Sequence, residues 1–487
     1  MAPHIALAVF TLGIAALIWL DRDRKDRTSP AIWIAVAWMF FGASRGVTQW
    51  LYGQTPTELD QYVDGSPYDR FLYSGLQLAA TLVLVRRANR VWALLRGNVP
   101  LVLFFAYCAL SIFWSDFPFV AFKRLIKTIG NLTMVWLLLT EEEPVAAVKR
   151  FFARTGVMLI PLSVLLIKYY PELGRQYSRW TWTPSFIGVS TDKNGLGVLT
   201  LVFGLGALWN MVEALREDTP SVRLQRALAH GGLVVMALWL FYMANSSTSL
   251  GCFLLGSAVV VSLAVARIER AATVHVLVAL AIAFGVCSYV FLDADAYVIE
   301  ALGRDSSLTG RTELWGTLLR FPINPWIGTG FESFWLGDRA EYFWNMYWWH
   351  PNEAHNGYLE MYLDLGWIGV AMIVVLMIAG YRNAVAGYQE NPGLGRLCLA
   401  LLLVAPVYSI TEAAFKLVNP LWLSFMLATT ALPPSQTPSK VPVDGPRPVP
   451  PNGVRTPPRQ GLMPTLTPWK MPPVGRRQRP VFKQVGR

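Results

Sequence analysis

The polar residues best suited to chemistry lie at positions 303–369, a stretch rich in glycine and tryptophan between two long apolar segments. It reads GRDSSLTGRTELW, then NPWIGTGFESFW, and later HNGYLEMYLDLGWIG. Arg311 carries a guanidinium group that can bind phosphate, and His355 carries an imidazole that can exchange a proton near neutral pH. The stretch is therefore predicted to be an extracytoplasmic loop that holds an active site.

His355 begins the third of these segments. If the segment starts a helix, His355 shares a face with Leu359 and Tyr362, while Asn356 and Glu360 share the next face. The imidazole could then take a proton from a hydroxyl, with Glu360 or Asn356 orienting it. An interfacial histidine that only caps or anchors the helix is the alternative. No second histidine follows at i+3 or i+4 and no cysteine cluster is present, so no metal and no cofactor are expected.

Arg311 lies in the segment SLTGRTELW. Ser307 or Thr309 can cap a helix that runs to about Arg320 and that Pro322 ends. Arg311 then falls in the first turn, where free backbone N–H groups and the helix dipole attract anions. The segment is predicted to bind a phosphate group.

The composition places these residues in a membrane protein. The chain has 487 residues, of which 54% are hydrophobic and 15% charged, and its mean hydropathy is +0.39. Soluble domains carry roughly a quarter charged residues. The net charge of +11 does not indicate nucleic-acid binding, because many basic residues fall in short loops where the positive-inside rule accounts for them. The four cysteines lie in apolar runs and form no disulfide framework.

The apolar runs predict an all-α polytopic membrane protein with about 12 or 13 transmembrane helices. Residues 5–20 are expected to be the first span rather than a signal peptide, because no basic start precedes them. We expect N-terminal spans in residues 1–98, a core in residues 99–432 with periplasmic loops at 169–195 and 293–362, and a disordered, Pro-rich, basic cytoplasmic tail in residues 433–487. Cytoplasmic turns are marked by Arg86, Arg87, Arg90 and Arg96.

Ten basic residues fall on the predicted outer side, against the positive-inside rule: Lys123, Arg124, Lys127, Arg175, Arg179, Lys193, Arg304, Arg311, Arg320 and Arg339. Such groups at membrane depth are costly and tend to be kept for an anionic partner, here a lipid diphosphate. Pairing with loop carboxylates is the alternative. The tryptophans of the loop could form an interfacial belt or line a groove for sugars: Trp326, Trp335, Trp344, Trp348 and Trp349. His350 could stack on a sugar or act structurally.

Five segments in order resemble the O-antigen ligase and polymerase superfamily, particularly its exopolysaccharide-polymerisation branch of Wzy-type polymerases. They are SLTGRTELW, PWIGTGFESF and HNGYLEMYLDLGWIG, with FWSDFPFVAFKRLIK at 113–127 and GVSTDKNGLG at 188–197. The similarity covers roughly residues 101–429. It implies a metal-independent glycosyltransferase of the bacterial inner membrane, with a periplasmic site. Such proteins move a glycan from undecaprenyl diphosphate to a hydroxyl of another lipid-linked glycan, in polymerases, or of the lipid A core, in ligases.

By motif position, the essential arginine and histidine of the superfamily fall on Arg311 and His355. We expect an acceptor hydroxyl to attack the anomeric carbon of the lipid-linked sugar, with His355 as base. The diphosphate is expected to be held by Arg311 and Arg304, helped by Arg175, Arg179 and Lys193. A polymerase is favoured over a ligase. A transporter of lipid-linked glycan and a non-catalytic scaffold are the other hypotheses. Membrane lipids and polysaccharide export machinery are further expected partners.

Overall fold

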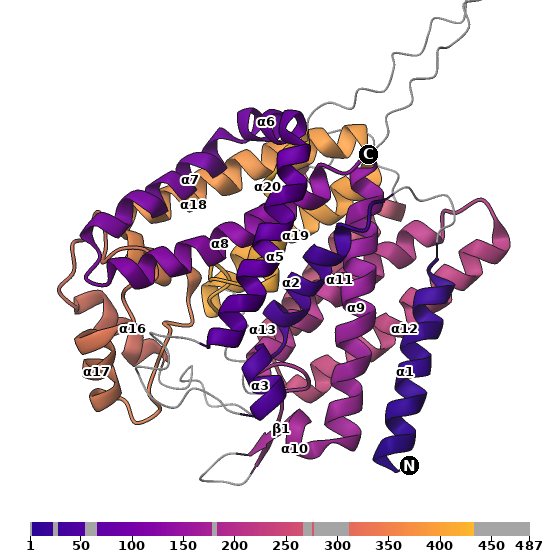
Figure 1. The fold of residues 1–487 in the computed structure, drawn as a ribbon, viewed down its shortest axis with the longest axis horizontal. Helices are drawn as coiled ribbons and strands as arrows, with labels where there is room; N and C mark the ends of the chain where they lie inside the picture. The colour runs from indigo at the N-terminus through magenta and orange to yellow at the C-terminus, as the bar shows by residue number, and fades with distance from the viewer. Residues whose placement is uncertain are drawn as a thin grey trace, which may run out of the picture. The chain divides into compact units, whose positions relative to one another are not determined.

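The computed structural model describes residues 2–22, 28–53, 66–177, 183–265, 275–276 and 311–432 (Figure 1). The predicted tail at 433–487 lies outside them. The helices are α1 (Pro3–Leu20), α2 (Ile32–Ala43), α3 (Val47–Tyr52), α5 (Pro67–Arg86), α6 (Ala88–Gly97), α7 (Val99–Leu110), the 3-10 helix η1 (Ser111–Trp114), α8 (Pro118–Leu139), α9 (Pro144–Tyr169), α10 (Pro171–Gly174), α11 (Lys193–Ala214), α12 (Pro220–Ala244), α13 (Ser247–Val265), α16 (Arg311–Arg320), α17 (Gly337–Met346), α18 (Gly357–Glu390), α19 (Pro392–Thr411) and α20 (Pro420–Thr429). Strands β1 (Arg175–Tyr177) and β2 (Pro184–Phe186) pair antiparallel.

Seven of the described helices are long and apolar enough to cross a bilayer: α1, α9, α11, α12, α13, α18 and α19. Helix α6 and the helical segment formed by α7 and η1 meet at a bend of 90°. If these two segments are counted as one span, they make an eighth. The prediction of an all-α polytopic membrane protein is confirmed. Fewer spans are found in the described residues than the 12 or 13 predicted. One reason is that the apolar runs at α2 and α20 form helices of only 12 and 10 residues, too short to cross alone.

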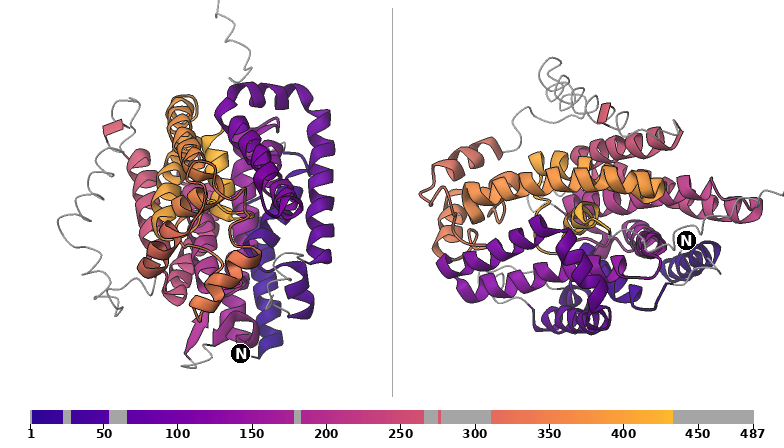
Figure 2. Two further views of the ribbon diagram at one scale, coloured as in Figure 1. Left: turned by 90° about the vertical axis from the view of Figure 1, so that its left-hand side faces the viewer. Right: turned by 90° about the horizontal axis from the view of Figure 1, so that it is seen from above.

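Helix α11 lies at the centre of the bundle and packs against α9, α12 and α13. The apolar part of α11 is 83% buried in the protein, whereas that of α1 is only 6% buried. Most of the surface of α1 is therefore exposed and available to contact lipid. Gly206 of α11 lets α9 approach closely, because a Cβ there would lie 2.5 Å from Phe152 Cδ1. Helix α18 packs against α7 and α19, and α19 packs against α13. Figure 2 shows the orange helices between the purple α7 and the pink α13.

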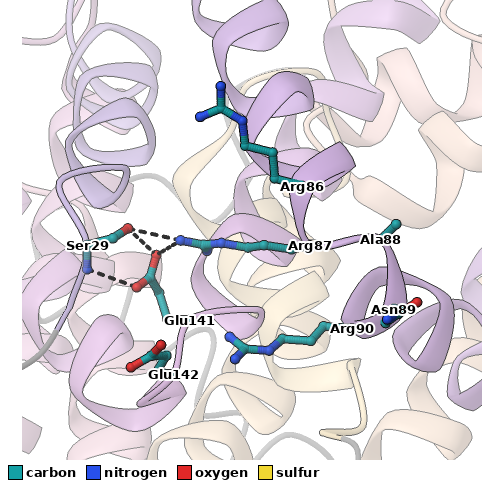
Figure 3. A pocket seen from close by; sticks show the side chains of 8 residues that line it. All are labelled: Ser29, Arg86, Arg87, Ala88, Asn89, Arg90, Glu141 and Glu142. Carbon is teal, nitrogen blue, oxygen red and sulfur yellow. Dashed lines mark hydrogen bonds and ion pairs between the residues drawn. The ribbon is translucent and has the colours of Figure 1, made fainter. Parts of the chain in front are cut away.

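One end of the bundle is rich in arginine. The turn between α5 and α6 lines a pocket of about 520 Å³, and Figure 3 shows Arg87 pointing across it toward Glu141 and Ser29. Arg87 Nη2 lies 2.6 Å from Glu141 Oε1. Glu141 also accepts hydrogen bonds from the backbone and the hydroxyl of Ser29, at 2.9 and 2.6 Å. Arg86 and Arg90 line the same pocket.

Ion pairs show which helix ends lie together. Glu213, in the last turn of α11, pairs with Arg396 near the start of α19 and lies 3.8 Å from Lys149 near the start of α9. At the other end of α11, Asn194 donates to Glu412, which directly follows α19, at 3.4 Å. Helix α9 begins just after Glu141, so the arginine-rich end and the Glu412 end are opposite ends of the bundle.

Residues 311–362, predicted as a loop, form α16, α17 and the start of α18. They have an apolar cluster of their own, with Leu314, Leu318, Phe334 and Phe343 fully buried. Helix α16 ends at Arg320, as the sequence predicted, before Pro322. Its predicted caps, Ser307 and Thr309, lie outside the described residues.

Candidate active site

The start of α18 and the end of α19 meet because the two helices are consecutive and pack against each other in opposite directions. His355 precedes α18, and Glu412 follows α19. His355 Nδ1 lies 3.2 Å from Glu412 Oε2. Asn356 caps α18, since its side-chain oxygen accepts from the backbone N–H groups of Tyr358 and Leu359 at 3.0 Å each. The local sequence thus fixes where the helix begins and leaves His355 just outside it.

Glu412 also binds Arg311, the first residue of α16. Arg311 Nη2 lies 2.9 Å from Glu412 Oε1, and its Nη1 donates to the carbonyl oxygen of Thr411 at 2.5 Å. One oxygen of Glu412 therefore contacts Arg311 and the other contacts His355. The two residues predicted from the sequence are brought together by a carboxylate from a third segment.

Two more residues complete this group. Glu353 Oε1 lies 2.8 Å from His355 Nδ1, and Glu353 Oε2 lies 2.5 Å from Lys416 Nζ. Lys416 Nζ also lies 3.7 Å from Glu360 Oε1. We call these residues the charge cluster: Arg311, Glu353, His355, Glu360, Glu412 and Lys416. When the imidazole is protonated, the charge cluster contains three cations and three carboxylates.

The cluster shifts the pKa values of its members. Burial disfavours the charged imidazole of His355, but hydrogen bonds to Glu353 and Glu412 and the charges of both carboxylates outweigh it and raise the pKa to about 9. Burial opposes the ionised carboxylate of Glu353, yet Lys416 and His355 hold its pKa well below the usual value. Burial opposes the charge of Lys416, yet Glu353 and Glu360 raise its pKa. The cluster therefore stabilises its own charges.

The imidazole is bound on one side. Both carboxylates contact Nδ1, and no residue in the described part of the chain bonds to Nε2. This arrangement favours the neutral tautomer with the proton on Nδ1, which leaves the lone pair of Nε2 available. The side chain is 21% exposed, so a substrate can reach it.

A metal ion is one possible occupant of the cluster. Ligand atoms of Glu353, His355 and Glu412 lie within 4.8 Å of one another, close enough to share an ion. Arg311 and Lys416 already contact the same carboxylates. A divalent cation would have to displace these side chains or bind against their charge, so the donor set favours protein cations over a metal.

Glu360 and Asn356, predicted to orient the imidazole, do not contact it in the described structure. Glu360 accepts from Trp335 Nε1 at 3.0 Å and from the backbone N–H of Ala354 at 2.5 Å. Asn356 caps α18 and donates to the carbonyl oxygen of Ile410 at 3.0 Å. A helix face by itself does not reveal these partners, because a polar side chain at a helix start bonds to the nearest free backbone group.

Glu353 and Glu412 hold the imidazole instead, and neither is in the set predicted from sequence. Two signals point to them. Glu353 lies two residues before His355. Glu412 is a rare acid in an apolar run, and the order of the spans places the end of that run beside the start of α18.

The predicted phosphate ligands are dispersed. Arg179 and Arg304 lie outside the described residues. Arg175 donates from Nε and Nη2 to the carbonyl oxygen of Ile167, at 3.1 and 3.0 Å, and ties the hairpin to α9. Lys193 is exposed as the first residue of α11, and its neighbour Asn194 contacts Glu412. The start of α11 therefore lies beside the charge cluster.

Two other cations predicted to lie on the outer side also bond to the backbone. Arg124 Nη1 donates to the carbonyl oxygen of Glu332 at 2.5 Å. Arg339 donates to the carbonyl oxygens of Ser333 and Phe334 at 3.0 and 3.2 Å. These side chains secure the segment between α16 and α17.

The fold and this cluster define a multi-pass membrane protein with a candidate active site where three chain segments meet at one end of the bundle. Residues 232–374 match the family model described as O-Antigen ligase, a range that includes Arg311, Glu353 and His355. The chain is also 23% identical over 322 residues to the exopolysaccharide production protein ExoQ of Rhizobium meliloti (strain 1021), covering 63% of this chain and 69% of that protein.

The predicted resemblance to the O-antigen ligase and polymerase superfamily is confirmed by these matches. They support a ligase- or polymerase-type enzyme of a bacterial membrane that acts in polysaccharide production.

Proposed function

We propose that this protein is an inner-membrane glycosyltransferase that polymerises glycan carried on undecaprenyl diphosphate for a surface polysaccharide. The observation that carries the proposal is the bridge from Arg311 through Glu412 to His355. It joins a phosphate-binding group to a proton acceptor at one point. The printed name of the relative, an exopolysaccharide production protein, favours polymerisation.

Arg311 is the proposed ligand of the diphosphate. Its guanidinium has five N–H donors, of which two are engaged by Thr411 and Glu412. The other three have no partner among the described residues. Glu412 fixes the guanidinium plane, so the remaining donors are presented in a set direction. Neutralising charge that develops on the departing diphosphate lowers the barrier to transfer.

His355 is the proposed base. A bond forms between the acceptor oxygen and the anomeric carbon while the bond from that carbon to the diphosphate oxygen breaks. The electron pair leaves with the diphosphate, and the proton of the acceptor hydroxyl passes to Nε2 of His355. Glu353 and Glu412 orient the ring through Nδ1, in the way that a carboxylate orients the histidine of a hydrolase triad.

The proposed site faces the periplasm. It lies at the end of the bundle opposite Arg86, Arg87 and Arg90, and arginine-rich turns favour the cytoplasmic side. Lipid-linked glycan would then reach the cluster from the outer leaflet.

The test uses His355→Ala and Arg311→Ala variants expressed in cells that lack the native protein. Both are expected to insert normally and to leave surface glycan as single repeat units on a gel. Arg320→Ala is the matched control, because Arg320 is exposed at the other end of α16. Normal-length polymer from correctly inserted His355→Ala and Arg311→Ala proteins would refute the proposal.

Ligation to the lipid A core is the second candidate function, and the description of the matching family model favours it. Deletion of the gene separates the two. Single-repeat products indicate lost polymerisation. Full-length lipid-linked glycan beside an unmodified lipid A core indicates lost ligation.

A further inference from the structure

A second pocket, of about 170 Å³, borders the charge cluster. Its walls include Arg124, Glu332, Trp335, Trp344, Glu360 and Lys416. We propose that this pocket binds a sugar ring of the acceptor glycan, with the Glu332 carboxylate accepting a hydrogen bond from a ring hydroxyl. The inference rests on the proposed function and adds the place where the acceptor is recognised.

A break in α18 builds one wall of the pocket. Gly366 has φ 64° and ψ −167°, so the helix kinks there and frees backbone carbonyl groups. The carbonyl oxygens of Leu363 and Asp364 accept from the backbone N–H groups of Thr329 and Gly330, at 3.0 and 2.8 Å. The segment after α16 is therefore fastened to the kink by backbone hydrogen bonds, which do not depend on flexible side chains.

This fastening sets the position of Glu332. Its φ of 53° lies in the left-handed region, which costs a non-glycine residue about 1 kcal/mol or more. The conformation is held because Arg124 binds the carbonyl oxygen of Glu332 and because Asp364 Oδ1 accepts from the backbone of Ser333 and Phe334 at 3.1 Å each. In the described part of the chain, the carboxylate of Glu332 itself has no hydrogen-bond or ion-pair partner. A strained backbone thus presents an unpaired acceptor to the pocket.

The two tryptophans are fixed as well. Trp335 donates from Nε1 to Glu360 at 3.0 Å, and Trp344 donates from Nε1 to the carbonyl oxygen of Pro351 at 3.0 Å. Trp344 also stacks on His350, with ring centroids 4.8 Å apart and an interplanar angle of 6°. With both N–H groups satisfied, the indoles offer apolar ring surface to a ligand.

The lining selects a neutral polyhydroxyl ligand over a phosphate. Three carboxyl groups, from Glu332, Glu360 and Asp364, face two cations, Arg124 and Lys416. Carboxyl groups exchange hydrogen bonds with hydroxyl groups. The two cations are already engaged, Arg124 by the carbonyl oxygen of Glu332 and Lys416 by Glu353. The pocket also adjoins the proposed base, because Lys416 bonds to Glu353, which holds His355. A sugar seated here lies beside the residues that would activate its neighbouring hydroxyl.

The experiment uses full-length protein in nanodiscs, lipid-linked repeat units from the producing cells as donor, and oligosaccharides released by partial acid hydrolysis of the same cells' surface polysaccharide as acceptor. Glu332→Gln removes the charge at nearly unchanged size, and Trp344→Ala removes the ring. Each is expected to raise both the acceptor KM and the Kd for the oligosaccharide by about tenfold, while the donor KM stays within about twofold. The control is Glu341→Gln, at an exposed site on α17.

The inference would be overturned if both pocket variants kept the wild-type acceptor KM and the wild-type Kd for the oligosaccharide. This holds even if the wild-type protein extends the oligosaccharide. Wild-type protein that extends nothing would contradict the proposed function instead. In that case, oligosaccharide binding that weakens in Glu332→Gln still supports the pocket as a sugar site, and no binding to the wild-type protein overturns it. Unchanged thermal unfolding of each variant confirms that the effect is local.

Discussion

The rate of glycan transfer is expected to rise with pH between 7 and 9. His355 can accept a proton only in its neutral form, and the carboxylates of Glu353 and Glu412 raise its pKa to about 9. About 1% of the imidazole is then neutral at pH 7 and about half at pH 9. At saturating donor and acceptor, kcat should therefore increase about fiftyfold over this range and level off above it.

Glu353→Gln is the informative perturbation. The amide oxygen can still accept from Nδ1 of His355, but the negative charge is lost, and the imidazole pKa should fall by roughly 1 unit or more. The midpoint of the profile should move to lower pH by the same amount. Lys416 keeps a partner in Glu360, 3.7 Å away. Removing a carboxylate from the candidate site should thus increase the share of active enzyme at pH 7.

The assay follows extension of lipid-linked repeat units by purified protein in nanodiscs, from pH 6 to 10. Glu341→Gln, at an exposed position of α17, should leave the midpoint unchanged. A wild-type rate that is flat or falls between pH 7 and 9 would show that neutral His355 is not the base. The same conclusion follows if Glu353→Gln leaves the midpoint in place.

The same ionisation should affect stability. The folded pKa of His355, about 9, lies above the ordinary value of 6.5, so the protonated imidazole stabilises the fold. This contribution is complete below about pH 6.5 and is lost as pH rises through 9, with a limit of about 3 kcal/mol. The unfolding temperature should fall over this interval, and His355→Gln should flatten the dependence. Equal slopes in both proteins would contradict the linkage.

Three further outcomes follow from the structure. Arg311→Ala should lower kcat by about 10² to 10³, whereas Arg320→Ala should leave it unchanged; equal loss would point to a general effect on α16. Gly366→Ala should lower the free energy of unfolding by more than about 1 kcal/mol, because a Cβ there would lie 2.2 Å from backbone atoms before α17. Gly387→Ala, in open space on the same helix, should not lower the unfolding temperature. Lys416→Met should lower the free energy of unfolding by roughly 3–5 kcal/mol, since two carboxylates lose their cation. An unchanged unfolding temperature would argue against the charge cluster.

The limits of sequence-based prediction are clearest for the spans. Each apolar run could be recognised from the sequence as a helix, but the length of that helix in the fold could not be predicted. The runs at α2 and α20 give helices of 12 and 10 residues. Within the stretch predicted as a periplasmic loop, the sequence predicted α16 but not α17. Helix α17 forms because phenylalanines and tryptophans pack on one another, and such packing involves partners that are distant in sequence.

The amino-acid sequence by itself determined the class of protein, the end of α16 at Arg320 and, to within two residues, the start of α18, which was expected at His355 and lies at Gly357. These features depend on local properties: apolar content, a following proline and an asparagine cap. Only the tertiary structure decided that Glu412 joins Arg311 to His355 and that Glu353 holds the same ring. Contacts between separate helices depend on how the helices pack and where α18 bends, and no local pattern encodes that geometry.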